Sequence, residues 1–393
     1  MSKFALSAGT RSVTDEVIAI RRDVHAHPEQ GFKEKRTSDL IERKLRSFGI
    51  ETKRVCGTGV IGLLRGAKPG PTILIRADID GLPVVELNKA PYVSRTSGVM
   101  HACGHDGHVA SALGAARLLA SRRSLIAGNV KFMFQPAEEG PPPGGAKPMI
   151  EAGLLKNPKV DYAFALHMWN DLPVGKIGVR PGPVMASADE FVITVKGVGG
   201  HGAAPHQTID PVVVASHLVV ALQTIVSRRV DPTKAAVVTV GQITSGNRFN
   251  IIPATATLVG TVRALEEGVR QLVKGELRKV IDGVTTAFGA TATLEYKDGY
   301  PPTLNDPAAT AMVRRAAEAV VGKANVVEQD VTLGAEDMSY VLKEVPGCYW
   351  FLGSNNRSRG LVHPHHSARF DFDEASLPIG VEIWAKLVEQ ILG

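Results

Sequence analysis

The stretch MHACGHDGHVA, residues 100–110, holds three histidines, a cysteine and an aspartate within eight positions, in a chain that has 12 histidines among its 393 residues. It follows a β-rich run and a loop, and it leads into ASALGAARLLASRR, whose alanine and leucine spacing predicts a helix. The stretch is therefore expected where a strand gives way to a helix in an α/β domain. Its thiol and imidazole groups are typical of a metal site, and polar residues gathered at a helix start are the alternative.

Short apolar runs on both sides of this stretch predict the strands of a sheet. GVIGLLRG (59–66) and TILIRADID (72–80) are β-rich, and the AKPGP between them predicts that they form a hairpin. NVKFMFQPAEEG (129–140) and YAFALHMW (162–169) predict buried strands, the first of which ends in a turn.

Helices are expected between and around these strands. Residues 14–48 predict a helix that is broken near Pro28 and a second helix from about Thr37 to Phe48. The run LPIGVEIWAKLVEQIL predicts a helix at the end of the chain. Strands that alternate with helices indicate an α/β fold.

A change of pattern near residue 186 indicates an inserted domain. From DEFVITVKGVGG onward, strands and helices follow in the order β-α-β-β-α-β, and the first pattern returns after about residue 300. We therefore predict a larger α/β domain at 1–185 and 299–393, and an inserted α+β domain at 186–298. The strands EFVITVKG and ATATLVGTV of the insertion are expected to offer sheet edges for a two-fold dimer.

The composition, with 44% hydrophobic and 21% charged residues, is that of a soluble globular protein. The N-terminal MSKFALSAGTRSVTDE lacks an apolar run of signal-peptide length. The longest apolar run, PVVVASHLVVALQTIV, is interrupted by His217 and Gln223 and is expected to be too short to span a bilayer. A cytoplasmic protein without a membrane partner is predicted. Three scattered cysteines do not predict a disulfide framework: Cys56, Cys103 and Cys348.

The net charge of +6 comes from dispersed basic pairs such as Arg21-Arg22 and Arg228-Arg229. The sequence has no basic stripe interleaved with aromatic residues, so binding to nucleic acid is not expected. Solvated helix faces explain these pairs, and the charge is compatible with a small anionic substrate.

One glycine pattern, GTGVIG at 57–62, matches the dinucleotide-binding fingerprint, and Asp78 and Asp80 follow it at a suitable distance. That binding mode needs a helix that starts at the third glycine, so that backbone N–H groups hold a pyrophosphate. Gly66 and Pro69 follow too closely for a helix to form. The pattern therefore does not predict a nucleotide site.

Three further clusters carry groups that bind metals or move protons. Glu138 and Glu139 end a strand, and adjacent buried carboxylates repel each other unless a cation or a proton neutralises one. One carboxylate can bind a metal while its neighbour acts as a base, and a solvated turn is the alternative. The other two clusters are His167, whose alternative is a satisfied core histidine, and the group His363, His365 and His366. Such clusters at strand ends favour a two-metal hydrolytic site.

The sequence resembles the amidohydrolase branch of the aminoacylase and glutamate-carboxypeptidase clan of metallopeptidases, which includes hippurate hydrolases, N-acyl-amino-acid amidohydrolases and plant auxin-conjugate hydrolases. The resemblance covers almost the whole chain. Its ordered motifs are RRDVHAHPEQGF, GTGVIGLLRG, LIRADIDGLPVVE, HACGHDGHVA, FQPAEEG, ALHMW, VKGVGGHGAAPHQTIDP, NIIPATATLVGTVR, GAEDMSYVL and HHSARFDFDE. It implies a mixed-sheet catalytic domain with a dinuclear metal site and an inserted lid and dimerisation domain.

The resemblance implies a site for two divalent metal ions, with zinc, manganese, cobalt and nickel all acceptable. Cys103 would bridge the ions as a thiolate, and the other ligands would be His105, Glu139, His167 and His366. This chain has Ser367-Ala368 where the family has Asn-Pro after the last histidine. The choice of His366 over His365 therefore rests on counting back from RFDFDE.

Five further residues match functional positions of the family. Glu138 would be the general base and acid, and Asp78 would orient a ligand histidine. His201 would stabilise the oxyanion from the partner subunit. Asn250 and Arg263 would hold the carboxylate or carbonyl of the substrate.

These roles imply that a homodimer or higher homo-oligomer hydrolyses N-acyl-amino acids, with hippurate-like or other aromatic acyl conjugates as expected substrates. A dipeptidase or carboxypeptidase of the same clan is one alternative, although the thiolate in HACGH, where peptidase branches use aspartate, favours the amidohydrolase branch. A non-catalytic metal- or ligand-binding protein that kept the fold is another alternative. The Glu138-Glu139 pair argues against it, because a binding protein does not need a base beside a ligand.

Overall fold

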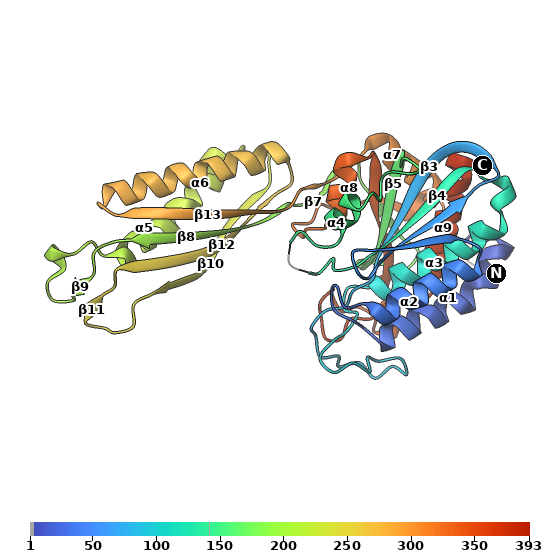
Figure 1. Ribbon diagram of the computed structural model, residues 1–393, viewed down its shortest axis with the longest axis horizontal. Coiled ribbons are helices and arrows are strands. Elements are labelled where there is room, and N and C mark those ends of the chain that lie inside the picture. Colours follow the sequence, from blue (N-terminus) through green and yellow to red (C-terminus); the bar gives the residue numbers. More distant parts are fainter. Residues whose placement is uncertain (1–3, 141) are drawn as a thin grey trace. The chain divides into compact units, whose positions relative to one another are not determined.

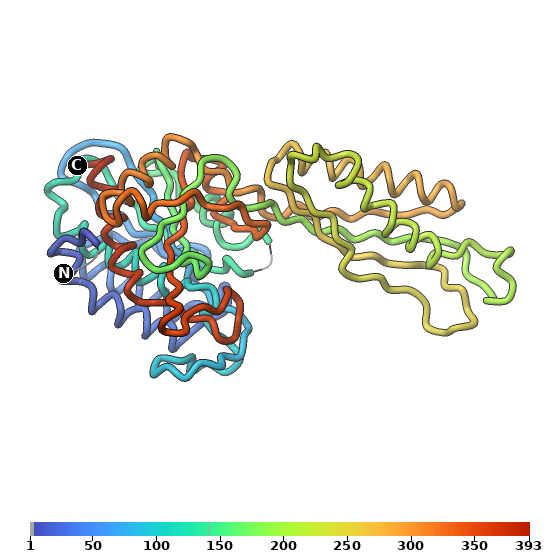
Figure 2. The backbone as a smooth tube through the Cα atoms, turned by 180° about the vertical axis from the view of Figure 1, so that it is seen from behind, coloured from blue at the N-terminus to red at the C-terminus, as the bar shows by residue number. Residues whose placement is uncertain are grey.

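The computed structural model describes residues 4–140 and 142–393, which form two compact units. Unit 1 contains the described residues of Met1–Val184, Leu304–Asp330 and Asp337–Gly393, and unit 2 contains Met185–Thr303 and Val331–Glu336. In Figure 2 the blue and red ends of the chain share unit 1, and the yellow-green to orange middle forms unit 2. Unlike the predicted insertion at 186–298, unit 2 includes 331–336, where the Gly334 carbonyl accepts a hydrogen bond from the Ala186 N–H.

The main sheet of unit 1 has eight strands: β1 (Glu51–Val55), β2 (Gly59–Arg65), β3 (Lys68–Asp78), β4 (Ala127–Gln135), β5 (Tyr162–Pro173), β6 (Ile177–Val179), β15 (Val326–Glu328) and β16 (Gly347–Asn355). Their order is β1-β2-β4-β3-β5-β16-β6-β15 (Figure 1). β3 is parallel to β4 and β5, and β5 is parallel to β16, whereas β2 is antiparallel to β1 and β4. The predicted α/β fold with a mixed sheet is confirmed. Two short strands form a separate pair: β7 (Gly182–Met185) and β14 (Thr303–Asn305).

The predicted hairpin between β2 and β3 is wrong, because β4 lies between these two strands. β2 instead forms a hairpin with β1, a strand that the apolar pattern did not reveal. The AKPGP connection runs beside the segment that leads into β4, where Gly66 and Ala67 donate backbone hydrogen bonds to the carbonyls of Gly128 and Ile126. A partner that is distant in the sequence therefore replaces the local pairing that the turn residues suggested. Gly59 begins β2, so GTGVIG continues into a strand and not a helix, as expected.

The helices of unit 1 are α1 (Ala8–Ala26), α2 (Lys35–Ser47), α3 (His105–Ser121), α4 (Ala146–Glu151), α7 (Pro307–Val321), α8 (Met338–Glu344) and α9 (Ser376–Leu392). α3 and α9 pack side by side on the central strands, and α1 lies across both. α1 begins earlier than predicted because the side chain of Ser7 accepts a hydrogen bond from the Thr10 N–H and caps the helix. The chain has single 3-10 turns at Arg123–Leu125, Pro205–Gln207, Lys323–Asn325 and Arg357–Arg359.

Unit 2 is a sheet of four antiparallel strands with two helices: β8 (Ala188–Lys196), β10 (Ala236–Ser245), β12 (Thr255–Ala264), β13 (Thr291–Tyr300), α5 (Pro211–Thr224) and α6 (Glu267–Ala287). Burial alternates along β8, where Phe191, Ile193 and Val195 are buried and the residues between them are not. α5 and α6 pack on the strands, as Figure 1 shows, and supply the core that these side chains enter. This alternation is typical of an antiparallel sheet with one covered face.

The strand order of unit 2, β10-β12-β8-β13, corrects one prediction. EFVITVKG and ATATLVGTV, which were expected to offer free sheet edges, are β8 and β12, and each has a paired strand on both sides. The edges of this sheet are therefore β10 and β13. Two short strands form a further pair in unit 2: β9 (Gly200–His201) and β11 (Ile251–Ile252).

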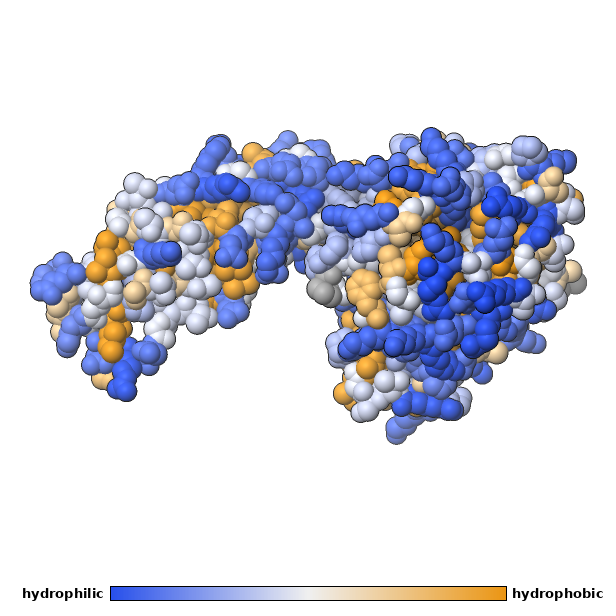
Figure 3. Space-filling model, in the orientation of Figure 1, coloured by the Kyte–Doolittle hydropathy of each residue, from blue (hydrophilic) through white to orange (hydrophobic). Residues whose placement is uncertain are grey.

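The apolar run in α5 is longer than the sequence suggested. α5 continues into a π-helical turn (Ile225–Arg229), and the helical stretch Pro211–Arg229 is long and apolar enough to cross a membrane by length and composition. Its residues Val214, Leu218, Leu222 and Ile225 lie in the core of unit 2. About 33% of the stretch is buried, and Val213 and Val220 are exposed. The visible face in Figure 3 has hydrophobic as well as hydrophilic areas on both units. The cytoplasmic location stays a prediction.

Candidate metal centre

The predicted metal ligands of unit 1 lie at the carboxyl ends of its central parallel strands. β3 ends at Asp78, β4 is followed directly by the turn that carries Glu138 and Glu139, and His167 lies within β5, two residues beyond the last one that pairs with β3. Parallel strands bring their carboxyl ends to the same edge of a sheet, where α/β proteins usually bind their ligands. The N-terminus of α3 adds Cys103 and its neighbours to this edge.

A tight turn before α3 brings Cys103 and His105 together. Gly104 between them has a φ of +90°, and a Cβ at this position would also lie 3.0 Å from the Cβ of Met168. The turn therefore requires glycine. His105 is already the first residue of the helix, whereas the sequence placed it in the irregular segment. Both side chains nevertheless reach one common point, as the sequence predicted.

Cys103 stands at the centre of two groups of ligand atoms. Its Sγ forms one group with nitrogens of His105 and His167. The same sulfur forms a second group with Glu139 and His366, and the atoms of each group lie within 4.8 Å of one another. The Cys103 Sγ lies 3.5 Å from the His167 Nε2. The structure thus brings together all five residues that the sequence singled out as ligands.

His105 is oriented by Asp80, a residue that the sequence analysis did not assign to the site. The His105 Nδ1 lies 3.0 Å from the backbone oxygen of Asp80 and 3.2 Å from its Oδ1, so it donates to this residue. The His105 Nε2 is buried and has no hydrogen-bond partner in the described parts of the chain. Burial without a partner is unfavourable for a polar atom, and a cation at this nitrogen would satisfy it.

Glu139 offers a second buried atom of this kind. Its N–H donates to the Asp80 Oδ2 over 3.0 Å, which fixes the backbone of the turn. Its Oε1 lies 3.0 Å from the His366 Nε2, yet the pair lacks hydrogen-bond geometry and this oxygen has no hydrogen-bond partner among the described residues. The Glu139 Oε1, and the His105 Nε2 once it has lost its proton, can therefore each offer a lone pair to a metal ion.

The adjacent histidines near the C-terminus have different surroundings. The His365 Nε2 lies 2.8 Å from the carbonyl oxygen of Met168 and donates to it. His366 has a φ of +65°, and its N–H donates to the Ala102 carbonyl. This strained conformation turns the His366 side chain toward Glu139. The arrangement favours His366 over His365 as the ligand.

The charges around Cys103 show why this site suits cations. Burial, together with Glu139 and Glu138, raises the pKa of the Cys103 thiol well above its usual range. Burial opposes a charge on His105, but Asp78 and Asp80 outweigh this effect and raise the pKa of His105 to about 10. The protein groups alone therefore keep the thiol protonated at neutral pH, and a thiolate there requires a cation.

The donor set of thiol, imidazole and carboxylate fits divalent metals of intermediate softness. Two groups of three ligand atoms that share one sulfur correspond to two neighbouring ions. The chain therefore has a dinuclear metal site, as the sequence predicted.

A buried network behind the ligands includes charged residues that the sequence analysis did not assign. The Arg76 guanidinium donates to Asp78 at 2.6 Å, to Gln135 at 2.9 Å and to Asp337 at 3.1 Å. Asp78 also lies 2.5 Å from the Nδ1 of His108. The role predicted for Asp78, the orientation of a ligand histidine, stays a prediction. Arg76, Asp78 and Asp80 alternate along IRADID, and this period of two could have indicated a shared face.

The remaining predicted residues belong to unit 2. His201 is exposed in β9, and its Nδ1 accepts a hydrogen bond from the Ala203 N–H. The carbonyl of Asn250 accepts a hydrogen bond from the Gly202 N–H, so Asn250 and His201 are neighbours in the β9–β11 pair. Arg263 lies in β12 and donates to the Thr261 hydroxyl over 2.7 Å.

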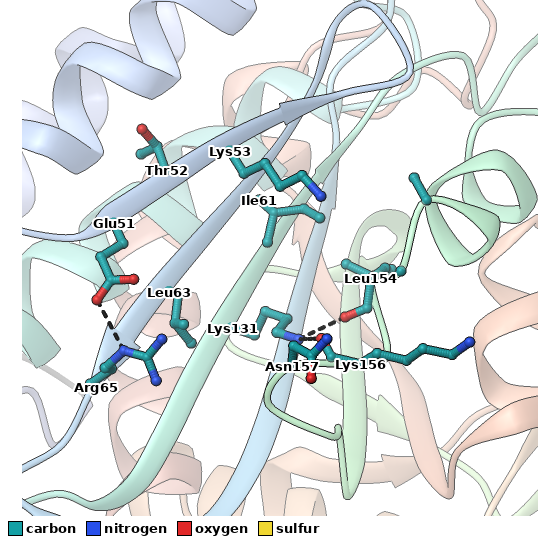
Figure 4. A pocket seen from close by; sticks show the side chains of 12 residues that line it. Glu51, Thr52, Lys53, Ile61, Leu63, Arg65, Lys131, Leu154, Lys156 and Asn157 are labelled. Atoms are coloured by element: carbon teal, nitrogen blue, oxygen red, sulfur yellow. Dashed lines mark hydrogen bonds and ion pairs between the residues drawn. The ribbon is translucent and has the colours of Figure 1, made fainter.

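A separate cavity of about 310 Å³ lies on unit 1, where β1, β2 and residues 152–157 meet (Figure 4). Its lining, with Glu51, Lys53 and Arg65 among the charged residues, contains neither histidine nor cysteine. It is therefore distinct from the metal centre. The Lys131 ammonium group in this cavity donates to the carbonyls of Leu154, Lys156 and Pro158 and holds that segment on the sheet.

Known proteins resemble this chain over most of its length. Residues 74–390 match the sequence model of Peptidase family M20/M25/M40. The chain is 43% identical over 378 residues to thermostable carboxypeptidase 1 of Saccharolobus solfataricus, with 95% of each chain covered. It is 42% identical over 306 residues to the N-acyl-L-amino acid amidohydrolase of Geobacillus stearothermophilus, with 78% of this chain and 82% of that one covered. A crystal structure of a dinuclear metal-binding peptidase of the M20 family from Bacillus subtilis matches with a TM-score of 0.86 and 36% identity, and covers 97% of this chain and 99% of that one.

Proposed function

Because the chain belongs to Peptidase family M20/M25/M40, we propose that this metal-dependent hydrolase of amide bonds acts on N-acyl-amino acids and releases a carboxylic acid and an amino acid. The observation that carries this proposal is the position of Glu138. Its Oε2 lies 3.9 Å from the His105 Nε2, and it forms a group of potential ligands with His105 and Glu139. A base beside metal ligands is needed for hydrolysis and has no use in a storage or binding site.

Glu138 is the proposed general base and acid. Its side chain is largely buried, and it follows β4 in a turn whose geometry is set by Asp80 and Glu139. It takes a proton from water and passes it to the leaving amine. When bound, two divalent cations polarise the amide carbonyl and lower the pKa of water. The proposed ligands are Cys103, His105, Glu139, His167 and His366.

Unit 2 supplies the proposed contacts to the substrate. His201 stabilises the oxyanion, and Arg263 binds the carboxylate of the amino-acid part in a bidentate pair. Asn250, which is exposed beside His201, contacts the same part of the substrate. We propose that His201 acts on the partner subunit of a homodimer. The exposed Val213 and Val220 of α5 and the free edges β10 and β13 support an interface on unit 2.

Hippurate-like and other aromatic acyl conjugates are the proposed substrates. The second candidate is a carboxypeptidase activity on short peptides, which the 43% identity to a protein named as a carboxypeptidase favours. The two activities differ in the group on the carbonyl side of the scissile bond, a simple acyl group or an amino acid.

A hydrolysis screen with protein loaded with zinc, manganese, cobalt or nickel tests these candidates. The panel pairs N-benzoyl, N-acetyl and indole-acetyl amino acids with dipeptides of the same C-terminal residue. Faster turnover of N-benzoylglycine than of phenylalanylglycine is expected. Turnover of the dipeptides alone would establish the carboxypeptidase. Failure to hydrolyse either class in metal-replete protein would contradict an enzymatic role.

The ligand assignment has its own test in the thiol of Cys103. Bound metal should protect this thiol from alkylation, and a chelator should expose it. Cys348 is fully buried and lies outside the ligand groups, so it serves as the internal control whose labelling stays constant. Equal labelling of Cys103 with and without chelator, followed by mass spectrometry, would count against its role as a ligand.

A further inference from the structure

The backbone of one residue, Met168, contacts three histidines through its N–H and its C=O. Its N–H donates to the Nε2 of His108 over 2.8 Å. Its carbonyl oxygen lies 2.6 Å from the Nδ1 of His167 and 2.8 Å from the Nε2 of His365. Two of these histidines, His108 and His365, are not among the proposed ligands.

The N–H and C=O of Met168 are free to bond to the histidines because the pairing of β3 with β5 ends before this residue. β3 and β5 pair up to Arg76 and Ala165, so β5 continues beyond the last residue that faces β3. On its other side β5 remains paired with β16 through this region. Met168 is buried, and a buried peptide group without a partner is unfavourable. Imidazole groups therefore take the place of a neighbouring strand.

The hydrogen bonds determine which ring nitrogens carry hydrogen. A carbonyl oxygen can only accept, so the His167 Nδ1 and the His365 Nε2 are both donors, and each uses one lone pair of the Met168 oxygen. The N–H of Met168 can only donate, so the His108 Nε2 is unprotonated. The hydrogen of His108 is then on Nδ1, where it donates to Asp78. His167 consequently keeps the lone pair of its Nε2, which faces the Cys103 Sγ.

We propose that His108 and His365 are positioning residues that clamp the backbone N–H and C=O of Met168, and that this clamp fixes the orientation and tautomer of the His167 ring for metal binding. The inference rests on the proposed role of His167 as a ligand. Both clamp residues also contact the His167 ring, with centroids 4.8 Å away for His108 and 5.1 Å away for His365. Interplanar angles of 70° and 74° place both contacts close to edge-on.

Packing around Met168 leaves the strand little room to move. A Cβ on Gly104 or on Gly107 would approach the Met168 side chain to 3.0 Å. α3, which carries His108, is thus pressed against β5 at the residue that the clamp holds. The clamp links Asp78 at the end of β3, α3 and the segment of His365 through the backbone of a single residue, Met168.

Metal affinity tests the clamp without reference to any substrate. Co²⁺ is titrated into metal-free protein, and binding is measured by calorimetry and by the thiolate-to-cobalt charge-transfer band of Cys103. His108→Leu and His365→Leu should each weaken Co²⁺ binding about 10- to 100-fold and alter the band. His108→Gln and His365→Gln keep an amide that can accept from or donate to Met168, so partial recovery is expected. His101→Leu is the matched control, because His101 is buried nearby and neither of its ring nitrogens has a hydrogen-bond partner among the described residues.

Wild-type affinity and spectrum in the two leucine variants would overturn the proposal. Equal losses in the leucine and glutamine variants would also overturn it, because they would show that volume and not hydrogen bonding matters. If a leucine variant does not fold, imidazole nitrogen NMR of the metal-free wild-type protein tests the proposal by determining the tautomer of His167. The expected state of His167 has hydrogen on Nδ1 and none on Nε2, and the reverse tautomer would contradict the clamp. Neither readout depends on turnover, so failure of the substrate screen would leave this inference standing.

Discussion

The metal centre of unit 1 and the β9–β11 pair of unit 2 carry residues proposed for the same reaction in opposite environments. Around the metal centre, Cys103, His105 and Asp78 are buried and tied to neighbours by several hydrogen bonds. In unit 2, His201 and Asn250 are exposed. His201 belongs to the two-residue strand β9, and Asn250 directly precedes its two-residue partner β11. The Phe249 side chain beside Asn250 is fully exposed.

This difference indicates two kinds of functional residue. Ligands need a preorganised geometry, because each bond to an ion depends on the orientation of a ring or carboxylate. Groups that close on a substrate can be exposed until the substrate arrives, since loops commonly carry such contacts. Substitutions in unit 1 should therefore change metal binding or chemistry, and those in the exposed part of unit 2 should change turnover without changing metal content or stability.

The largest expected effect is that of Glu138→Gln. Loss of the base should lower kcat by about two to four decades, while the metal content stays at the wild-type value because the ligands remain. Turnover and metal content measured on the same preparation check this. Glu151→Gln, an exposed carboxylate at the end of α4, is the control and should retain activity. Near-normal turnover of a metal-replete Glu138→Gln protein would contradict the assignment of Glu138 as the general base.

His201→Ala should lower kcat by about 10²- to 10³-fold, the usual effect of removing one oxyanion donor. Because His201 is exposed, the free energy of unfolding should change by less than about 0.5 kcal/mol. Thermal unfolding and metal analysis should therefore match the wild type. If His201→Ala loses metal together with activity, the assignment of metal binding to unit 1 and of substrate contacts to unit 2 would be contradicted.

Mixed dimers of Glu138→Gln and His201→Ala show which subunit His201 serves. If it acts on the partner, one of the two sites in each mixed dimer is intact. Random mixing makes half of the dimers mixed, so about a quarter of all sites should recover. Absence of recovery in verified mixed dimers would eliminate the action in trans and leave the metal ligands unaffected.

Arg263→Met should raise KM for an acyl-amino acid about 10- to 100-fold, because a charged bidentate pair is lost. Arg263→Lys should recover part of the affinity. Steady-state kinetics with hippurate and with its carboxamide provide the comparison, since the carboxamide lacks the charge that Arg263 binds. A variant that still prefers hippurate to the carboxamide by the wild-type ratio would argue against this role.

The smallest expected effect is the pH dependence of metal binding. The pKa of the Cys103 thiol is raised by burial and that of His105 is about 10, so both groups hold a proton at neutral pH and lose it when a cation binds. Metal affinity should therefore rise with pH, by about tenfold per unit for each proton released. Competition with a chromophoric chelator measures this slope. Cys103→Ser should lower the slope of metal affinity against pH by the equivalent of one released proton. An unchanged slope would show that the thiol is not a ligand.

The residue types of the site could be predicted from the sequence because their chemistry is local. Two short motifs contain residue types that commonly bind metals: Cys103 with His105, and Glu138 beside Glu139. The residues that hydrogen-bond to these ligands and orient them could not be predicted in the same way. Asp80 and His108 act through hydrogen bonds to atoms far away in the sequence, and the choice of one ring nitrogen over the other depends on those partners.

Most secondary-structure elements and the α/β class follow from the periodicity of apolar residues, which each segment carries by itself. The mostly polar strand β1 is an exception. The order of strands does not, because any strand with an apolar face can pair with several others. AKPGP looked like a hairpin turn, yet β4 occupies the position between β2 and β3. The sequence thus determined the elements and the donor set. Only the tertiary structure decided the neighbours of β8 and β12 and the hydrogen-bond partner of His365, because these depend on which distant backbone groups satisfy each other's hydrogen bonds.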